Sequence, residues 1–535
     1  MLDNLRMAAR LARDLRTFLQ QPYTLDDCHR LLKDQLARRD ESFLEIMARA
    51  VFANPRSPYL ALMRHAGITL GDVVAWTRRD GVEGALGELY RAGVHVTLDE
   101  FKGRRPMRRD GIEVAVRDHD FDNPLLTAYY ENWSSGAHSA GTRARVDLGL
   151  LSHEAAFELV FLTALDLLGR PIGIWRPALP AGAGINILLR HARIGILVER
   201  WFSQAEFRLS RGLWRHYLFI RYAIAMSRLW GRPLPAPRYT PLGQAVAVAR
   251  WLARKRAEGT PGYLEAPVSS AVRVCVAARE HGLDIEGTYF RVGGEPLTET
   301  RARIITEAGG RVVAHYSLAE IGRLGVACPA PAAVDEVHVL SDKVVLSQRE
   351  RSVGGSTVGA LFCSTIHPAV PKIMVNVELG DHGVLGERAC GCPFDRLGYR
   401  QHLHTVRSYE KLTSEGMQFV GSELLRLLEE VLPARFGGHP TDYQLVEDEE
   451  GGLPKVSLVV SPRVGDVDET RMIATALEVL ASSPRGRAGN HIMAGVWRDA
   501  QTLRVIRREP HANRAAKILP LHVVNQTAPT PELLH

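Results

Sequence analysis

The sequence has few cysteines, which excludes a disulfide scaffold. The chain of 535 residues contains six, at positions 28, 275, 328, 363, 390 and 392. Secreted domains that depend on disulfides carry cysteine at a far higher density. We therefore expect a protein of a reducing compartment, the cytoplasm.

Long hydrophobic runs are also missing. The two most apolar stretches, 155–169 and 216–230, are interrupted by charged side chains such as Glu158 and Arg221. A membrane-spanning helix needs about 20 mostly apolar residues. Residues 1–21 contain two aspartates and indicate an amphipathic surface helix rather than a signal peptide. We expect no membrane partner.

Neither positive nor negative charge dominates any large part of the chain. There are 67 basic and 60 acidic residues, a formal net charge of +7, and the one dense basic run is KGRRPMRRDG at 102–111. No aromatic residue interleaves those charges, so the run predicts a solvated loop rather than a nucleic-acid patch. We expect no nucleic-acid partner, although an anionic cofactor such as CoA could use this run.

A complete dinucleotide fingerprint is absent as well. The nearest approach to G-x-G-x-x-G is GAGINI at 182–187, which lacks the last glycine. Because that glycine allows the helix to pack closely on its strand, its loss disfavours an NAD-dependent oxidoreductase.

The length predicts about three or four folding units. Residues 1–100 place apolar side chains at helical spacing, and 101–325 alternate short strands with helices, so the predicted fold class is α/β. Residues 326–407 predict a small β-rich subdomain with strands in VDEVHVLSDKVVLSQ and VGALFCSTI. Residues 408–535 predict a small α+β domain, with a helix in SELLRLLEEVLP and a hairpin in DYQLVEDEEGGLPKVSLVVSP.

The stretch GGEPLTETRARIITEAGGRVVAHYSLAEIG, 293–322, is a complete local unit. Thr298 can cap a helix that ends at Gly309, and RVVAHY has the β-branched character of a buried strand. We expect Ser317 to Gly322 to form the loop after that strand. Ligands bind at the carboxyl ends of strands in open α/β sheets, so this unit is a candidate wall of a site.

Three further segments accompany this unit. WSSGAHSAGTRARVDLG, 133–149, is a Ser/Gly/Thr-rich loop of the kind that cradles phosphates with backbone N–H groups. NVELGDHGVL, 376–385, predicts a strand that ends at Gly380-Asp381. VRSYEKLTSEG, 406–416, predicts the turn into the last unit.

In this order the segments resemble the adenylate-forming enzymes, and among them the phenylacetate–CoA ligase-like branch. GGEPLTE is similar to the Gly-Gly-Glu-Pro-Leu turn of that branch, HYSLAEIG to the Tyr-Gly-x-Thr-Glu loop, and ELGDHG to the Arg-Thr-Gly-Asp segment. RSYEKLTSEG resembles the hinge, and EPHANRAAKILPL resembles the segment that delivers a catalytic lysine. The resemblance spans nearly the whole chain. It implies a large α/β domain for nucleotide and acid with a small mobile C-terminal domain.

The activity implied by the resemblance is ATP-dependent activation of a carboxylic acid through an acyl-adenylate, with transfer to CoA. Lys517 and Glu320 would be catalytic, and Glu320 would bind the Mg²⁺ that bridges the phosphates of ATP. Ser134, Ser135 and Gly136 would cradle those phosphates. A carrier protein or a protein side chain stays open as the acceptor in place of CoA, and the sequence does not name the acid.

The remaining contacts to the nucleotide follow from the same resemblance. Gly294, Glu295 and Pro296 would form a wall beside the adenine, and Tyr316 would flank the adenine. Asp381 would bind the ribose hydroxyls, and Arg407 would support the ribose–phosphate.

The chain departs from the family pattern at several of these segments. The phosphate loop has Ala137-His138-Ser139 in place of Thr-Thr-Gly, and Glu378 stands where an arginine is expected. Ser317 and Ala319 replace a glycine and a threonine, and Thr413 replaces the hinge lysine. The change of arginine to glutamate weakens phosphate attraction most directly. A non-catalytic nucleotide-binding relative therefore stays open as a second interpretation.

Four residues of the β-rich region suggest a metal site. Cys390 and Cys392 flank a glycine in RACGCPF, and Cys328 and His338 lie in ACPAPAAVDEVHV. Three cysteines and one histidine are a standard set of ligands for structural zinc. Because no paired C-x-x-C signature is present, plain buried thiols stay open as the alternative.

Overall fold

The computed structural model describes most of the chain. The described residues are 2–133, 143–178, 184–204, 214–353, 356–408, 413–414, 417–418, 421–450, 453–481, 503–512, 518 and 521–523.

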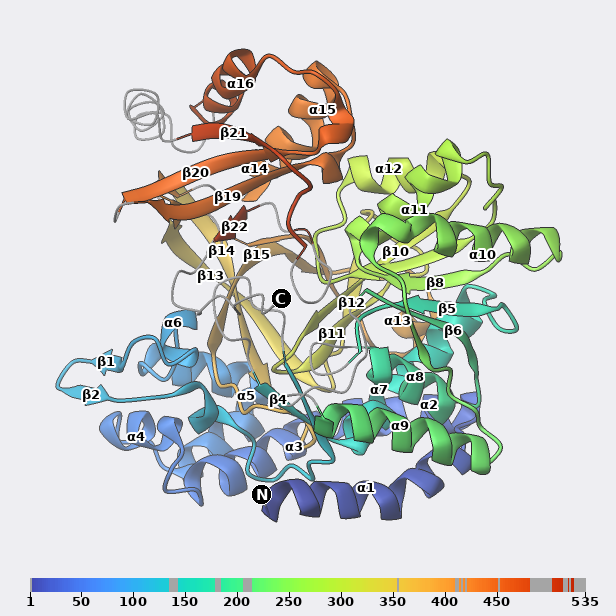
Figure 1. Ribbon diagram of the computed structural model, residues 1–535. Coiled ribbons are helices and arrows are strands. Elements are labelled where there is room, and N and C mark those ends of the chain that lie inside the picture. The colour runs from blue at the N-terminus through green and yellow to red at the C-terminus, as the bar shows by residue number, and fades with distance from the viewer. Residues whose placement is uncertain are drawn as a thin grey trace.

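The first hundred residues are mainly helical, as predicted, and lie along the bottom of Figure 1. One side of the first helix is buried through Leu11, Leu15 and Leu19 at helical spacing. The helices are α1 (Leu2–Gln20), α2 (Leu25–Ala37), α3 (Arg39–Ile46), η1 (Met47–Phe52), α4 (Pro58–His65), α5 (Leu70–Arg91) and α6 (Leu98–Phe101).

A 12-stranded sheet runs through the molecule in the order β13-β14-β15-β16-β12-β11-β10-β9-β8-β5-β6-β7. One half is parallel, and its strands alternate with helices along the chain, which confirms the predicted α/β class. The parallel strands are β5 (Ile172–Trp175), β6 (Val198–Ser203), β7 (Pro237–Tyr239), β8 (Tyr263–Ala266), β9 (Tyr289–Gly293) and β10 (Arg311–Leu318).

Helices cover both faces of the parallel half. Neighbouring residues of one strand face opposite layers: Tyr263 packs in the cluster with α7 and α8, and Leu264 packs in the cluster with α10 and α11. Strands buried on both faces have continuous apolar runs for this reason. The helices are α7 (Leu148–Ala164), α8 (Gly184–Arg193), α9 (Trp214–Leu229), α10 (Ala245–Ala257), α11 (Val268–Glu280) and α12 (Glu299–Glu307).

The other half of the sheet is antiparallel and includes the strands predicted within 334–348 and 358–366. Its inner face packs on the helices α3 to α6 in a second core. The strands are β11 (Gly322–Ala327), β12 (Val337–Val339), β13 (Val344–Val353), β14 (Ser356–Thr365), β15 (Val377–Glu387) and β16 (Gln401–Ser408), and the short helix α13 (Pro393–Leu397) precedes β16.

Two strand ends differ from the sequence expectation. The strand predicted to end at Tyr316 continues to Leu318, so the expected loop from Ser317 is only a tight turn into β11. The strand predicted to end at Asp381 continues to Glu387. Gly380 has a φ of +72°, and the register shifts between His382 and Val384. The Gly-Asp pair therefore marks an irregular stretch within a strand, not its end.

The C-terminal unit has its own sheet and core, shown in orange and red at the top of Figure 1. The predicted hairpin is β19 (Tyr443–Glu450) with β20 (Leu453–Val460), and the predicted helices are present. The unit also contains α14 (Gly421–Arg426), η4 (Leu427–Val431), α15 (Leu432–Phe436), α16 (Glu469–Ala481), β21 (Leu503–Arg507) and β22 (Leu521–Val523).

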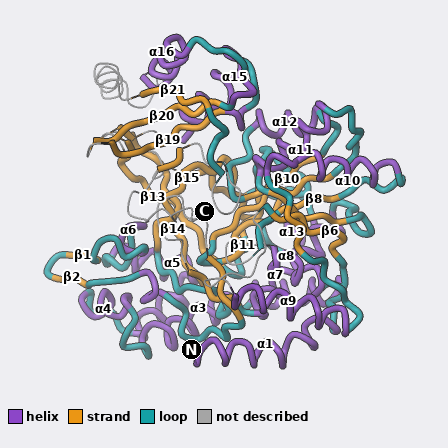
Figure 2. Tube along the Cα trace, in the orientation of Figure 1, coloured by secondary structure: helices purple, strands orange, loops and turns teal. Residues whose placement is uncertain are grey.

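Short hairpins complete the architecture, and Figure 2 labels the strands of one of them, β1 (Met107–Arg109) and β2 (Ile112–Val114). The basic run 102–111 was expected to be a solvated loop, but part of it is the strand β1, paired with β2. A second hairpin joins β3 (Tyr130–Trp133) to β4 (Arg143–Val146), and the two-residue strands β17 (Thr413–Ser414) and β18 (Met417–Gln418) pair near the C-terminal unit. Among the described helices, none combines the length and apolar character that crossing a membrane requires.

Candidate functional site

The turn after β9 lies at the carboxyl edge of the parallel strands. Gly293 pairs with His315 of β10, and a Cβ at Gly293 would stand 2.7 Å from the His315 carbonyl oxygen, so only glycine fits. Gly294 has a φ of +83°, which also favours glycine. The backbone of this turn therefore approaches the end of β10 closely.

The carboxylate of Glu295 is bound by protein groups and is almost fully buried. It accepts hydrogen bonds from the N–H and the hydroxyl of Ser269 at 2.9 and 2.8 Å, in the first turn of α11. It also pairs with Arg301 at 3.4 Å, and Arg301 donates to the Pro296 carbonyl oxygen at 3.1 Å. Glu295 thus fixes the turn, and only the backbone of the Gly294–Pro296 segment is available to a ligand.

Tyr316 and Asp381 meet across the sheet. The Tyr316 hydroxyl donates to the Asp381 carboxylate at 2.6 Å, although the two residues are 65 positions apart. Burial and the neighbouring carboxylate raise the pKa of Tyr316 well above its usual value. The tyrosine of the 293–322 unit and the aspartate of the 376–385 segment therefore form one polar pair.

Arg407 lies beside this pair on β16. It stands opposite His382, next to Asp381, and its guanidinium bonds to Asp335 at 3.3 Å and to the Val406 carbonyl oxygen at 2.7 Å. The arginine side chain is mostly buried, and its ion pair with Asp335 fixes it near the end of β16.

Glu320 occupies the tight turn between β10 and β11. Its side chain is only 10% exposed and forms an ion pair with Lys102, which directly follows α6. Its carbonyl oxygen accepts from the Lys372 N–H at 3.2 Å, which anchors the turn to the segment before β15. The turn thus holds a carboxylate four residues beyond Tyr316.

Four predicted site residues cannot be placed in this way. Ser134, Ser135, Gly136 and Lys517 lie outside the described residues.

Glu378, which replaces an expected arginine, has a partner that the sequence did not reveal. Its side chain is fully buried on β15, and Arg351 of β13 bonds to it at 2.9 Å. The negative charge is therefore compensated locally.

Sequence reasoning also missed a buried charge network beneath the site. Glu154 and Glu158 lie one turn apart on α7 and face the sheet, where four cations contact them. Burial acts to raise the pKa of Glu158, but Arg291 and Arg323 hold it well below its usual value. The cations are Arg190, Arg291, Arg323 and Lys343. A helical i, i+4 pair of glutamates in an otherwise apolar stretch was the available signal.

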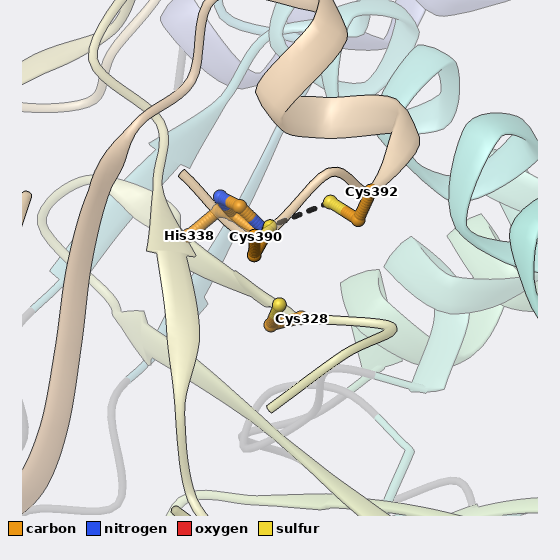
Figure 3. A group of neighbouring side chains, drawn as sticks. All are labelled: Cys328, His338, Cys390 and Cys392. Atoms are coloured by element: carbon orange, nitrogen blue, oxygen red, sulfur yellow. Dashed lines mark hydrogen bonds between the residues drawn. The ribbon is translucent and has the colours of Figure 1, made fainter. Parts of the chain in front are cut away.

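The four predicted metal ligands come together from three separate segments (Figure 3). Cys328 follows β11, His338 lies on β12, and Cys390 and Cys392 precede α13. One ligand atom from each lies within 4.8 Å of all the others. The His338 Nε2 is 3.1 Å from the Cys392 sulfur and 3.6 Å from the Cys390 sulfur.

The contacts that surrounding residues make with these four side chains favour metal binding. The His338 Nδ1 lies 2.7 Å from the Tyr399 carbonyl oxygen, so it carries the proton and leaves Nε2 as the ligand atom. Arg388 lies 3.7 Å from the Cys328 sulfur and is held by Glu336. A hydrogen bond from the neighbouring Cys328 thiol lowers the pKa of Cys392 well below its usual value, against the effect of burial. Three sulfurs and one imidazole nitrogen fit a tetrahedral Zn²⁺.

The C-terminal unit contacts the large unit through a buried acid. Glu429 of η4 accepts from the Thr298 hydroxyl and pairs with Arg301 at 2.8 Å. Arg301 also pairs with Glu295, so one guanidinium joins the turn after β9 to the C-terminal unit.

Comparisons with known proteins give distant likenesses. The sequence matches no family model and no curated protein. A 2-hydroxyisobutyryl-CoA ligase, solved in an open conformation with 2-HIB-AMP and CoA, shares 13% identity, with 95% of this chain and 93% of that chain covered and a TM-score of 0.45.

Two other solved structures are similar at the same level. A fatty acyl-adenylate ligase, from a study of the enzymes of E. coli and L. pneumophila, shares 12% identity over 74% of this chain and 68% of its own, with a TM-score of 0.40. An acetoacetyl-CoA synthetase from Streptomyces lividans shares 11% identity over 68% and 51%, with a TM-score of 0.39.

Proposed function

We propose that this protein activates a carboxylic acid with ATP, through an acyl-adenylate, and transfers the acyl group to a thiol, with CoA as the acceptor. The observation that carries the proposal is the pair of Tyr316 and Asp381 beside the Gly294–Pro296 turn. An aromatic ring and a carboxylate at the carboxyl edge of a parallel sheet are suited to an adenine and to ribose hydroxyls.

The chemistry requires positioning and charge more than covalent work by the protein. The substrate carboxylate attacks the α-phosphorus of ATP, the bond to pyrophosphate breaks, and the acyl-adenylate forms. Glu320 offers a mostly buried carboxylate that already holds a cation, Lys102, and this donor fits Mg²⁺. When bound there, Mg²⁺ would neutralise charge on the phosphates. Asp381 would orient the ribose, and Arg407 would support the neighbouring phosphate.

The proposal is tested by exchange of labelled pyrophosphate into ATP with a broad panel of aromatic and aliphatic acids. At least one acid should support exchange. In Asp381→Ala the affinity for ATP should fall about tenfold or more, the effect of losing hydrogen bonds to a charged group. Circular dichroism should show an unchanged fold. Normal ATP affinity in this variant would remove Asp381 from the site.

The acceptor is decided by a second measurement. A thioester should form when CoA is added to the enzyme, ATP and the active acid. A product only with a carrier protein would identify the alternative acceptor. ATP binding without exchange for any acid would instead support a non-catalytic nucleotide-binding relative.

We also propose a structural zinc site at Cys328, His338, Cys390 and Cys392, because their four ligand atoms converge. Protein purified without chelator should contain about one zinc per chain, and Cys392→Ser should lose the metal and thermal stability. The control is Cys28→Ser, since Cys28 is equally buried but lies outside the set. Equal zinc content in both variants, or none in the native protein, would leave only buried thiols.

A further inference from the structure

The basic run 102–111 is not used by the proposed chemistry, but its first residue contacts the candidate site. Arg104 and Arg105 pair with Asp99, and Arg108 pairs with Glu113, all at the surface. Lys102 instead turns inward to Glu320, and its side chain is 22% exposed. One cation of the run therefore enters the candidate site.

The fold brings Lys102 there from the helical N-terminal region. It follows α6, which packs against β15, the strand that carries Asp381 (Figure 1). Thr97 caps α6 with a reciprocal hydrogen-bond pair to Glu100, and Arg109 holds Glu100 at 2.9 Å. The backbone at Lys102 is thus anchored, while its four-carbon side chain can still reorient.

We propose that Lys102 is a phosphate-binding residue of the nucleotide site, which pairs with Glu320 in the free protein and turns to the polyphosphate when a divalent cation takes the Glu320 carboxylate. The inference rests on the proposed function. A carboxylate that binds a divalent cation repels a nearby ammonium through that cation, so Lys102 has to find another anion. The phosphates of ATP are the anions that arrive with the metal.

Two departures from the family pattern explain why the site would need an additional positive charge from Lys102. Where the resembled family has two threonines and a glycine, this sequence has Ala137-His138-Ser139, and Glu378 stands where that family has an arginine. Both changes remove groups that would attract phosphate. A lysine from another segment restores one positive charge, and its three donors suit phosphate oxygens.

A purely structural ion pair would behave differently. It would join α6 to the β10–β11 turn and contribute to stability, but it would have no effect on how tightly the protein binds metal or nucleotide. Binding measurements therefore separate the two roles.

The experiment compares Lys102→Met with Arg105→Met, whose side chain is 77% exposed in the same basic run. Isothermal titration calorimetry gives the ATP affinity at saturating Mg²⁺, and a Mn²⁺ titration followed by water-proton relaxation gives the metal affinity of the free protein. We expect Lys102→Met to weaken ATP binding about tenfold or more and to tighten Mn²⁺ binding, because the competing ammonium is gone. Lys102→Arg should recover part of the ATP affinity, and Arg105→Met should leave both values within about twofold of the native ones.

Each result decides the question. Native ATP affinity in Lys102→Met, or an equal loss in Arg105→Met, overturns the inference while the proposed function stands. If the native protein binds no ATP at all, the proposed function and the inference both fail. A variant that unfolds is replaced by Lys102→Gln, which keeps a polar but neutral side chain one atom shorter than lysine, with the same expectations.

Discussion

The buried network on α7 gives the sharpest prediction about stability. Glu158 is fully buried, and its two carboxylate oxygens lie between the guanidinium groups of Arg291 and Arg323, which are fully buried as well. Glu158→Gln keeps the shape of the side chain and removes only the charge. It leaves two buried cations short of a counter-charge, and breaking a buried pair in this way costs about 3–5 kcal/mol.

A matched surface variant isolates the effect of burial. Glu258 pairs with Lys255 at 2.9 Å but is 49% exposed, so Glu258→Gln should cost about 0.5 kcal/mol or less. The assay is urea unfolding of both variants and of the native chain, followed by hydrogen exchange that resolves the strands β9 and β11. Exchange is needed because a chain with several cores need not unfold in one step.

The result that would refute this reasoning is a similar loss in the two variants. It would mean that the guanidinium groups of Arg291 and Arg323 find other partners when Glu158 is neutral. The expected result is a loss of protection confined to the strands that carry these arginines, with the C-terminal unit unchanged.

Two further predictions concern pH and the contact between units. The pKa of Glu158 is held low in the folded chain, so its charge stabilises the fold above the usual carboxylate pKa of about 4.3, and this stabilisation is lost as the pH falls below that value. Acid unfolding of the native chain should therefore begin in that range. Glu158→Gln should make the free energy of unfolding depend less on pH. Glu429→Gln removes a charge from the buried contact with Arg301, so a trace of protease should separate the C-terminal unit from the large unit faster than in the native chain. Glu430→Gln, at an exposed neighbouring residue, should match the native rate.

Local signals in the sequence predicted much of the secondary structure. The helix after Thr298 forms as expected, because the Thr298 hydroxyl caps it, and the predicted antiparallel pairing of β19 with β20 extends from Tyr443–Val460 to Glu450–Leu453. The four candidate metal ligands could be grouped from their positions, since Cys390 and Cys392 flank one glycine and Cys328 and His338 lie at the start of the predicted β-rich region.

The rest depended on contacts between distant residues. Gly380-Asp381 has the composition of a turn, but pairing with β14 and β16 on both sides keeps the strand continuous past it. Lys343 reaches Glu154 across 189 positions, and Lys102 reaches Glu320 across 218. No local pattern marks such pairs, because either charge alone is typical of a solvated side chain.

The place of the candidate site follows from the change of direction within one sheet. β10 runs parallel to β9 up to His315 and pairs antiparallel with β11 from Tyr316 onward, with a register shift between Tyr316 and Ser317. A parallel sheet brings the carboxyl ends of its strands to one edge, whereas an antiparallel strand can continue past that edge. Asp381 lies on such a continuing strand.

This geometry explains why the candidate residues come from separate parts of the chain. Gly294 and Tyr316 reach the edge because their parallel strands end or change partner there, Asp381 reaches it from the antiparallel half, and Glu320 sits in the turn that joins the halves. Moving any one strand by a single residue would turn its side chain to the opposite face. The register shifts in β10 and β15 lie beside the site: one directly follows Tyr316, and the other follows His382, the neighbour of Asp381.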